Sequence, residues 1–121
     1  MKTMVIFGAS NKINRYSYKV ILFLKRKNNY KIIPVHPDLS YIEGIPVVTT
    51  LDDIHESVDI LSIYVKPEIL EKHLAHIVDL KPRMIILNPG TESSVAEMYF
   101  EKHCIIYHKA CTLVLLKTGV L

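Results

Sequence analysis

The sequence has no tryptophan, only four glycines and two cysteines, no long hydrophobic run and no strong excess of either charge. Two cysteines are too few for the disulfide framework of a small secreted protein. We therefore expect Cys104 and Cys111 to be reduced, buried thiols. No apolar run reaches the ~18 residues that a membrane-spanning helix needs. The first residues, MKTMVIFG, end in a turn too early for a secretory signal peptide.

What the chain does contain is typical of a globular protein. Half of its 121 residues are hydrophobic, which excludes disorder and favours one domain over residues 1–121. We expect a cytoplasmic protein without a membrane partner, and a homo-oligomer remains possible. Fifteen basic and twelve acidic side chains give a net charge of only +3. Nucleic-acid binders usually carry a concentrated basic stripe, so we expect no nucleic-acid partner, whereas a small anionic ligand is permitted.

The six histidines do not form a metal-binding pattern. His73 and His76 are three residues apart on a predicted helix and so share a face. No cysteine or carboxylate at ligand spacing completes a set around them, and the segment HCIIYHKAC has no zinc-site spacing. The sequence therefore predicts no metal site.

Short apolar runs alternate with longer mixed segments. The runs predict strands at 4–7, 30–37, 58–65, 83–88 and 104–107. The mixed segments predict helices at 16–27, 50–58 and 66–81, with Thr50 at the N-terminus of the second. The segment 89–103 predicts a turn followed by a helix, with Thr91 at the N-terminus of that helix. A loop with a turn at Gly44 is expected between 38 and 50, and the apolar segment 110–121 has no assigned form.

The predicted strands are apolar on both sides, as strands are when helices cover both faces of a parallel sheet. Strand–helix repetition at this spacing favours an α/β fold, a single Rossmann-like, doubly wound sheet of about five parallel strands. Ligands of such sheets bind beyond the carboxyl ends of the strands, where the connections change sides. The segments that follow the strands, at 8–15, 35–37, 64–67 and 88–90, are therefore the candidate site.

The first of these segments has the chemistry of an anion site. Gly8 permits a tight turn and close approach of a phosphate, and Ser10 offers a hydroxyl. The start of the following helix adds free N–H groups, and Lys12 and Arg15 add positive charge. A simple strand–helix turn with solvated basic residues explains the same residues equally well.

Three better-known sites fit this turn poorly. A dinucleotide fingerprint needs three spaced glycines and an acid at the tip of the second strand. Here Ser10 and Ile13 stand in glycine positions, and the second strand ends in Val35, His36 and Pro37. A P-loop is excluded because the Gly-Lys-Ser/Thr triplet is missing, and a hydrolase elbow around Ser10 lacks its second glycine.

Five segments together resemble the CoA-binding domain family, which is related to the N-terminal domain of the succinyl-CoA synthetase alpha subunit. They are FGASNKINRYSYKV, YKIIPVHP, EGIPVVTTLDDI, VDILSIYVKPE and MIILNPGTES, in the family's order over nearly the whole chain. The resemblance implies a Rossmann-like sheet with coenzyme A across the carboxyl ends of the strands. It places the phosphates at Gly8, Ser10 and Arg15, with Lys66 as a second phosphate contact.

For the rest of coenzyme A the resemblance also names positions. The adenosine half would lie beside Val35, His36 and Pro37, and the channel would be lined by Tyr64, Val65, Lys66 and Pro67. The pantetheine end would face Asn88, Pro89 and Gly90. In similar proteins an asparagine usually stands at His36, a proline near Ile13, and a glutamine often at Asn88.

These observations together predict a binding module for coenzyme A or an acyl-CoA rather than an enzyme. The phosphorylated histidine of the synthetases lies in a further domain, and no histidine here is paired in sequence with a nucleophile. Exchange between coenzyme A and one of the two cysteines would require an exposed thiol near the pantetheine end. Two alternatives stay open: an NAD(P)-binding oxidoreductase or redox sensor, and a scaffold domain with a vestigial pocket.

Overall fold

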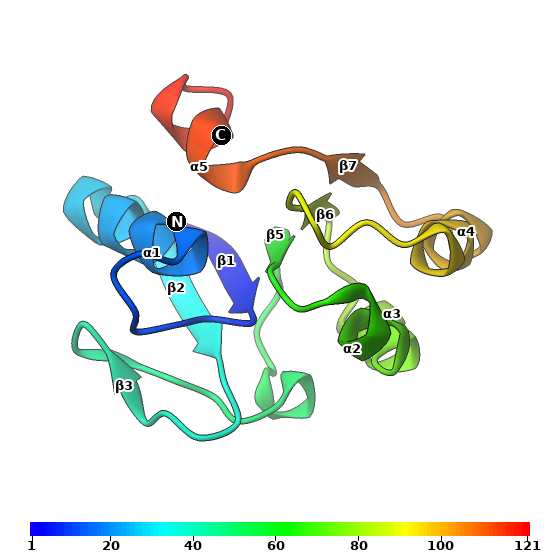
Figure 1. Cartoon of the computed structure of the whole chain (residues 1–121), viewed down its shortest axis with the longest axis horizontal. Coiled ribbons are helices and arrows are strands. Elements are labelled where there is room, and N and C mark those ends of the chain that lie inside the picture. Colours follow the sequence, from blue (N-terminus) through cyan, green and yellow to red (C-terminus); the bar gives the residue numbers. More distant parts are fainter.

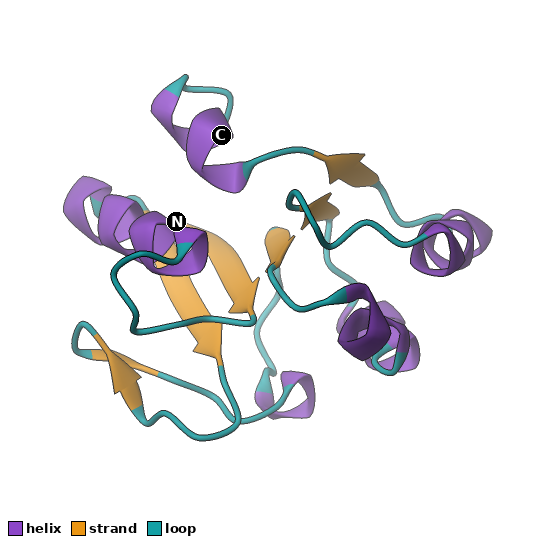
Figure 2. Ribbon diagram, viewed as in Figure 1, coloured by secondary structure: helices purple, strands orange, loops and turns teal.

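The structure, a computed structural model, describes all residues from 1 to 121 and shows a five-stranded sheet with helices on both faces (Figures 1 and 2). The large sheet contains β1 (Lys2–Phe7), β2 (Tyr30–Val35), β5 (Ile60–Ile63), β6 (Met84–Leu87) and β7 (Tyr107–Lys109). The helices are α1 (Tyr16–Lys27), η1 (Leu51–Asp53), α2 (Pro67–Glu71), α3 (Leu74–Leu80), α4 (Ser94–Lys102) and α5 (Thr112–Lys117). A hairpin of β3 (Tyr41–Ile42) and β4 (Ile45–Pro46) lies outside the large sheet.

All five strands of the large sheet are parallel, in the order β2-β1-β5-β6-β7. The chain builds outward from β1 to β2, returns to the other side of β1, and then adds β5, β6 and β7 in turn. The connections therefore change direction between β1 and β5, which is where ligands of open α/β sheets bind. The prediction of a doubly wound, Rossmann-like parallel sheet is confirmed.

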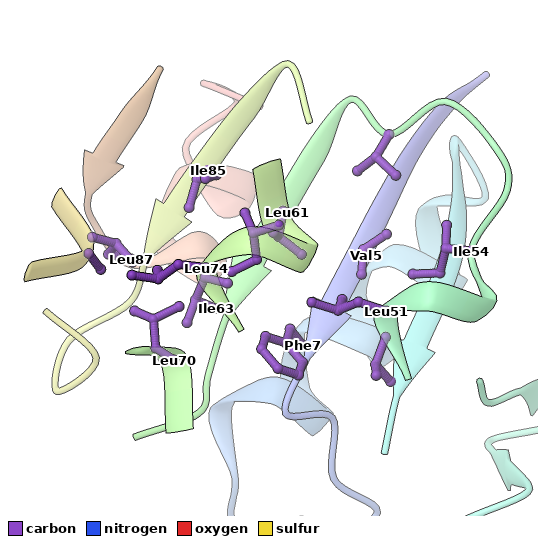
Figure 3. Close-up of a cluster of buried hydrophobic side chains, with 14 of the residues drawn as sticks. Val5, Phe7, Leu51, Ile54, Leu61, Ile63, Leu70, Leu74, Ile85 and Leu87 are labelled. Carbon is purple, nitrogen blue, oxygen red and sulfur yellow. The ribbon is translucent and has the colours of Figure 1, made fainter. Parts of the chain in front are cut away.

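Each face of the sheet has its own hydrophobic core. On one face Val5, Phe7, Leu61, Ile63, Ile85 and Leu87 pack under η1 and α2–α4, as Figure 3 shows. On the other face Met4, Ile6, Ile60 and Ile86 pack under α1 and α5, which lie side by side (Figure 1). Alternate residues of one strand thus enter opposite cores, which is why the strands show no polar side.

Several predicted elements have the expected bounds. The helix predicted at 16–27 is α1, and it ends at Asn28, whose φ of 55° forms a left-handed cap. Thr50 caps η1 in a capping box with Asp53, although η1 is one turn of 3-10 helix rather than the helix predicted at 50–58. The loop between 38 and 50 contains the hairpin, whose turn at Glu43 and Gly44 has positive φ at both residues.

Other predictions were wrong at the level of single elements. The helix predicted at 66–81 is broken at Lys72 and His73 into α2 and α3. The N-cap of α4 is Ser93, whose side chain accepts from the N–H of Ala96, and not Thr91. The last strand does not occupy 104–107, because Cys104 has a φ of 58° and Ile105 N–H returns to the carbonyl of Phe100.

The segment without an assigned form, 110–121, contains the short helix α5. The structure contains no helix of the length and hydropathy that a membrane span requires. The two thiols also differ from the prediction, since Cys104 is exposed and Cys111 is half-buried.

Candidate functional site

A cleft of about 1070 Å³ opens at the carboxyl edge of the sheet, over the place where the connections change direction. The segments that follow β1, β2, β5 and β6 line it, and so do the first turns of α1 and α5. The predicted site residues that the structure brings together in this cleft are Gly8, Ser10, Lys12, Arg15, His36, Tyr64, Val65, Lys66, Asn88, Pro89 and Gly90.

Three predicted residues do not line the cleft. Val35 is buried within the sheet, where it pairs with Phe7, so its side chain belongs to the core. Pro37 is exposed in the turn after β2. Pro67 is the first residue of α2, where its fixed φ and missing N–H suit a helix start. For Val35 and Pro67 the structural role accounts for the residue type.

Other lining residues were not predicted from the sequence. They are Ala9, Asn11, Asn14, Tyr16, Ser17, Leu39, Thr91, Cys111 and Val114. The lining residues in the turn after β1 and in α1 lie within or next to the segment 8–15, which the sequence predicted as part of the site because it follows a strand. Cys111 and Val114 carried no such signal, because the last segment had no assigned form and its return to the cleft depends on tertiary packing.

Gly8 is required by the close approach of two chain segments. Its φ is +94°, and a Cβ added there would lie 2.9 Å from the Tyr64 carbonyl carbon and from the Val65 nitrogen. The N–H groups of Gly8 and Ala9 both point to the Val35 carbonyl, at 3.4 and 3.1 Å. Packing against the segment after β5 is therefore a reason for this glycine that the sequence did not reveal.

The backbone N–H groups that are free to bind an anion lie after the β1–α1 turn, at the start of α1. Arg15 is the N-cap, and no side chain caps the helix. The N–H groups of the first helical turn have no partners within a helix, so this end is positive and unsatisfied. Ser10 Oγ accepts from Lys12 N–H at 3.0 Å, which fixes the turn and leaves the hydroxyl proton free to donate.

All charged side chains that line the cleft are positive. Lys12, Arg15 and Lys66 line it, and none of the three takes part in an ion pair. No aspartate or glutamate lines the cleft. Three cations without counter-ions beside an uncapped helix N-terminus favour an anionic ligand over a neutral or cationic one.

His36 holds the turn after β2 through its ring. Nδ1 accepts from the N–H groups of Asp38 (3.0 Å) and Leu39 (3.1 Å), as an asparagine oxygen would in a turn. With Nδ1 an acceptor, the neutral ring carries its proton on Nε2, which is left as a donor.

Asn88 forms the floor of the cleft with its own network. Its amide nitrogen donates to Ser62 Oγ (3.0 Å) and to the Ile63 carbonyl (2.8 Å). Its amide oxygen accepts from Thr112 N–H at 2.8 Å, and Ser62 and Thr112 share a hydrogen bond of 2.8 Å. Both N–H donors of the side chain are used within the protein and its oxygen accepts one bond, so Asn88 joins β5, β6 and α5.

Tyr64 has the one buried side-chain polar atom without a hydrogen-bond partner. Its hydroxyl is near Ser62 and Thr112 but meets hydrogen-bond geometry with neither. Burial raises the pKa of Tyr64 to about 12, against smaller opposing effects of those two hydroxyls. The phenol is therefore neutral at physiological pH.

Removing this hydroxyl should stabilise the ligand-free protein. Tyr64→Phe is expected to raise the free energy of unfolding by about 1 kcal/mol, because a buried donor without a partner costs ~1–3 kcal/mol. Urea unfolding without ligand measures the change. Tyr99→Phe is the control at a half-buried tyrosine outside the cleft. A loss of stability in Tyr64→Phe, with Tyr99→Phe unaffected, would mean that the Tyr64 hydroxyl has a partner.

Comparisons with known proteins agree with this fold. The crystal structure of an uncharacterized protein is 31% identical, with a TM-score of 0.91, covering 100% of this chain and 98% of that one. A Thermus thermophilus protein is 29% identical, with a TM-score of 0.88, over 97% of this chain and 89% of its own. No curated protein is significantly similar.

A larger protein carries the same fold as one of its parts. The dinucleotide-forming acetyl-coenzyme A synthetase 1 of Ca. Korarchaeum cryptofilum superposes with a TM-score of 0.76, at 12% identity. The match covers 90% of this chain and 26% of the synthetase chain, and at this identity it shows a shared fold. The family model described as "CoA binding domain" matches residues 2–117. The chain therefore belongs to the CoA-binding domain family, as the five sequence segments indicated.

Proposed function

We propose that the protein binds coenzyme A, or an acyl ester of it, in the cleft at the carboxyl edge of the sheet. The observation that carries the proposal is the set of three unpaired cations, Lys12, Arg15 and Lys66, in a cleft without carboxylates. Membership of the CoA-binding domain family supports coenzyme A as this anion. The cleft volume of about 1070 Å³ lies at the upper end of ligand pockets, ~300–1,000 Å³, as a long ligand requires.

The diphosphate would lie at the N-terminus of α1. Arg15 can grip a phosphate with two donors, and Lys12 adds a charge from the same turn. The unsatisfied N–H groups of the first turn of α1 add the helix dipole. Gly8 and Ala9 would line the site without donating hydrogen bonds to the diphosphate, because the Val35 carbonyl already accepts from both N–H groups.

The adenosine and pantetheine arms would leave the diphosphate in opposite directions. His36 and Leu39, after β2, would flank the adenosine, with His36 Nε2–H as a donor to it. Tyr64, Val65 and Lys66, after β5, would line the start of the pantetheine channel, and Pro89 and Gly90, after β6, its continuation. Asn88 and Pro67 would support these walls rather than touch the ligand.

The cleft is less suited to NAD. A carboxylate at the tip of the second strand normally accepts the ribose hydroxyls of that cofactor. His36 occupies this position and presents a donor, while exposed Asp38 does not line the cleft.

Thermal unfolding with coenzyme A, dephospho-coenzyme A, NAD and no ligand tests the proposal. A ligand at a hundred times its dissociation constant stabilises the folded protein by ~2.7 kcal/mol. For a chain of this size that corresponds to a rise of roughly 8–16 °C in the midpoint. We expect this rise with coenzyme A and a smaller one with dephospho-coenzyme A.

The other outcomes separate the alternatives. A rise with NAD alone would overturn the proposal in favour of a nicotinamide-binding protein. No rise with any of the three nucleotides would indicate that the cleft is not used for nucleotides, and would favour a scaffold function.

A further inference from the structure

We propose that Cys111 exchanges disulfides with coenzyme A bound in the cleft, so that the protein is reversibly linked to the cofactor under oxidising conditions. The inference rests on the proposed function and adds a covalent, redox-dependent state to it. Cys111 lines the cleft and is half-buried there. It supplies the cleft's only thiol, and coenzyme A carries a thiol at the end of its pantetheine arm.

Hydrogen bonds of the next residue place Cys111 beside the segment after β6. Thr112 N–H donates to Asn88 Oδ1 at 2.8 Å, and Thr112 Oγ1 shares a hydrogen bond of 2.8 Å with Ser62 of β5. The chain therefore returns from β7, at the edge of the sheet, across β6 toward β5. The proposed pantetheine channel ends at this segment after β6, and the adenosine would lie on the other side of β1, near the end of β2. A pantetheine arm that follows this channel brings its thiol toward Cys111.

The backbone of Cys111 is held firmly at this position. Thr112 N–H, the next donor along the chain, is bound to the buried amide oxygen of Asn88. The carbonyl of Cys111 accepts from Leu115 N–H at 3.0 Å, so the residue also begins α5. The thiol is therefore presented from a fixed support that links β5, β6 and α5.

A second observation at this end of the cleft concerns Tyr64. Its hydroxyl is buried, lacks a hydrogen-bond partner and lies near Thr112, the residue after Cys111. A buried donor of this kind is rarely left unpaired. Donation to the sulfur of a disulfide formed at Cys111 would satisfy the hydroxyl.

The exchange needs a coenzyme A disulfide as co-reactant, either the symmetric disulfide or one with a small thiol. The Cys111 thiolate attacks the sulfur of the coenzyme A that lies in the cleft. A bond forms between Cys111 Sγ and that sulfur, the original S–S bond breaks, and the leaving thiolate takes up the proton lost by Cys111. One disulfide is consumed and one is formed, and excess thiol reverses the reaction.

Cys104 provides an internal control for reactivity that does not depend on the cleft. It is the more exposed of the two thiols, and it lies between α4 and β7 outside the cleft. Oxidation governed by exposure alone would modify Cys104 first. Reaction guided by cofactor binding would modify Cys111 first.

The experiment treats the reduced protein with coenzyme A disulfide or, separately, with oxidised glutathione, and follows intact mass and peptide mapping over time. We expect one coenzyme A per chain on Cys111, formed on the order of tenfold faster than its glutathione adduct, because binding in the cleft positions the reactant. Cys111→Ser should lose the adduct, Cys104→Ser should keep it, and dithiothreitol should release it.

Equal rates with the two disulfides, or modification of Cys104 ahead of Cys111, would overturn the inference. Calorimetry with reduced coenzyme A under reducing conditions separates its failure from that of the proposed function. Binding of reduced coenzyme A without an adduct on Cys111 would refute the exchange alone. Absence of both would refute the proposed function as well.

Discussion

Replacing Gly8 with alanine is expected to lower the free energy of unfolding by about 3 kcal/mol or more, without any ligand present. Two costs add at this position. A positive φ strains an L-residue by ~1–3 kcal/mol. The new Cβ would also meet the Tyr64 carbonyl carbon and the Val65 nitrogen at 2.9 Å, and overpacking of this kind costs another ~1–3 kcal/mol. Urea unfolding measures the sum.

Gly44→Ala is the matched control, because Gly44 has a φ of +77° but no atom within 4 Å of an added Cβ. It carries the conformational cost alone, so we expect a loss of about 1 kcal/mol. The difference between the two variants isolates the contact between the first turn and the segment after β5. Equal losses would show that the backbone at Tyr64 and Val65 moves aside easily, and that the approach seen at Gly8 does not restrict the residue type.

The parts of the fold that follow from local pattern were predicted well from the sequence. The strands are apolar on both sides because both faces of the sheet are covered, and this pattern depends on no detail of packing. The helix α1 has apolar residues at helical spacing and clear signals at its C-terminal end: a basic last turn and Asn28 in a left-handed cap.

The wrong predictions lie where tertiary contacts outweigh local pattern. The segment 66–81 has helical periodicity throughout, yet it divides at His73, where Phe7 contacts the histidine ring edge-on at a centroid distance of 5.3 Å. Residues 104–107 are apolar like a strand, but Ile105 closes the end of α4 and pairing begins at Tyr107. The break in the helix and the later start of the strand leave the hydrophobic periodicity of the sequence unchanged, so the sequence pattern could not reveal them.

The same distinction applies to the cleft. The positions after the strands and the family resemblance predicted which segments form the site, and the structure brings most of the predicted residues together in the cleft. They could not separate residues that face the cleft from those that support it. Asn88 and Gly8 are polar or small as ligand contacts often are, but their hydrogen bonds and packing lie within the protein. From the sequence, Cys111 was a candidate for exchange with coenzyme A only because it is a thiol. The structure adds that it lines the cleft, at the start of α5.

Removing both cations of the first turn should weaken coenzyme A binding more than ~100-fold. Each charge-assisted hydrogen bond contributes ~1.5–3 kcal/mol, so Lys12→Ala combined with Arg15→Ala is expected to cost about 3 kcal/mol or more. Both side chains are exposed and take part in no ion pair, so their loss should leave the free energy of unfolding nearly unchanged. Calorimetry measures the affinity, and urea unfolding checks the stability.

The matched control is Arg26→Ala with Lys27→Ala, which removes the same two residue types from the other end of α1. The helix has 12 residues, so the two sites are separated by ~18 Å. At 0.15 M salt the screening length is ~8 Å, and charges at that distance act weakly on a ligand in the cleft. We expect the control to bind within ~threefold of the original protein, since surface substitutions away from a site rarely exceed ~0.5 kcal/mol. If both double variants lost the same affinity, binding would depend on net charge rather than on contacts at the first turn. If neither did, the phosphates would have to lie elsewhere in the cleft, with Lys66 as the remaining cation that lines it.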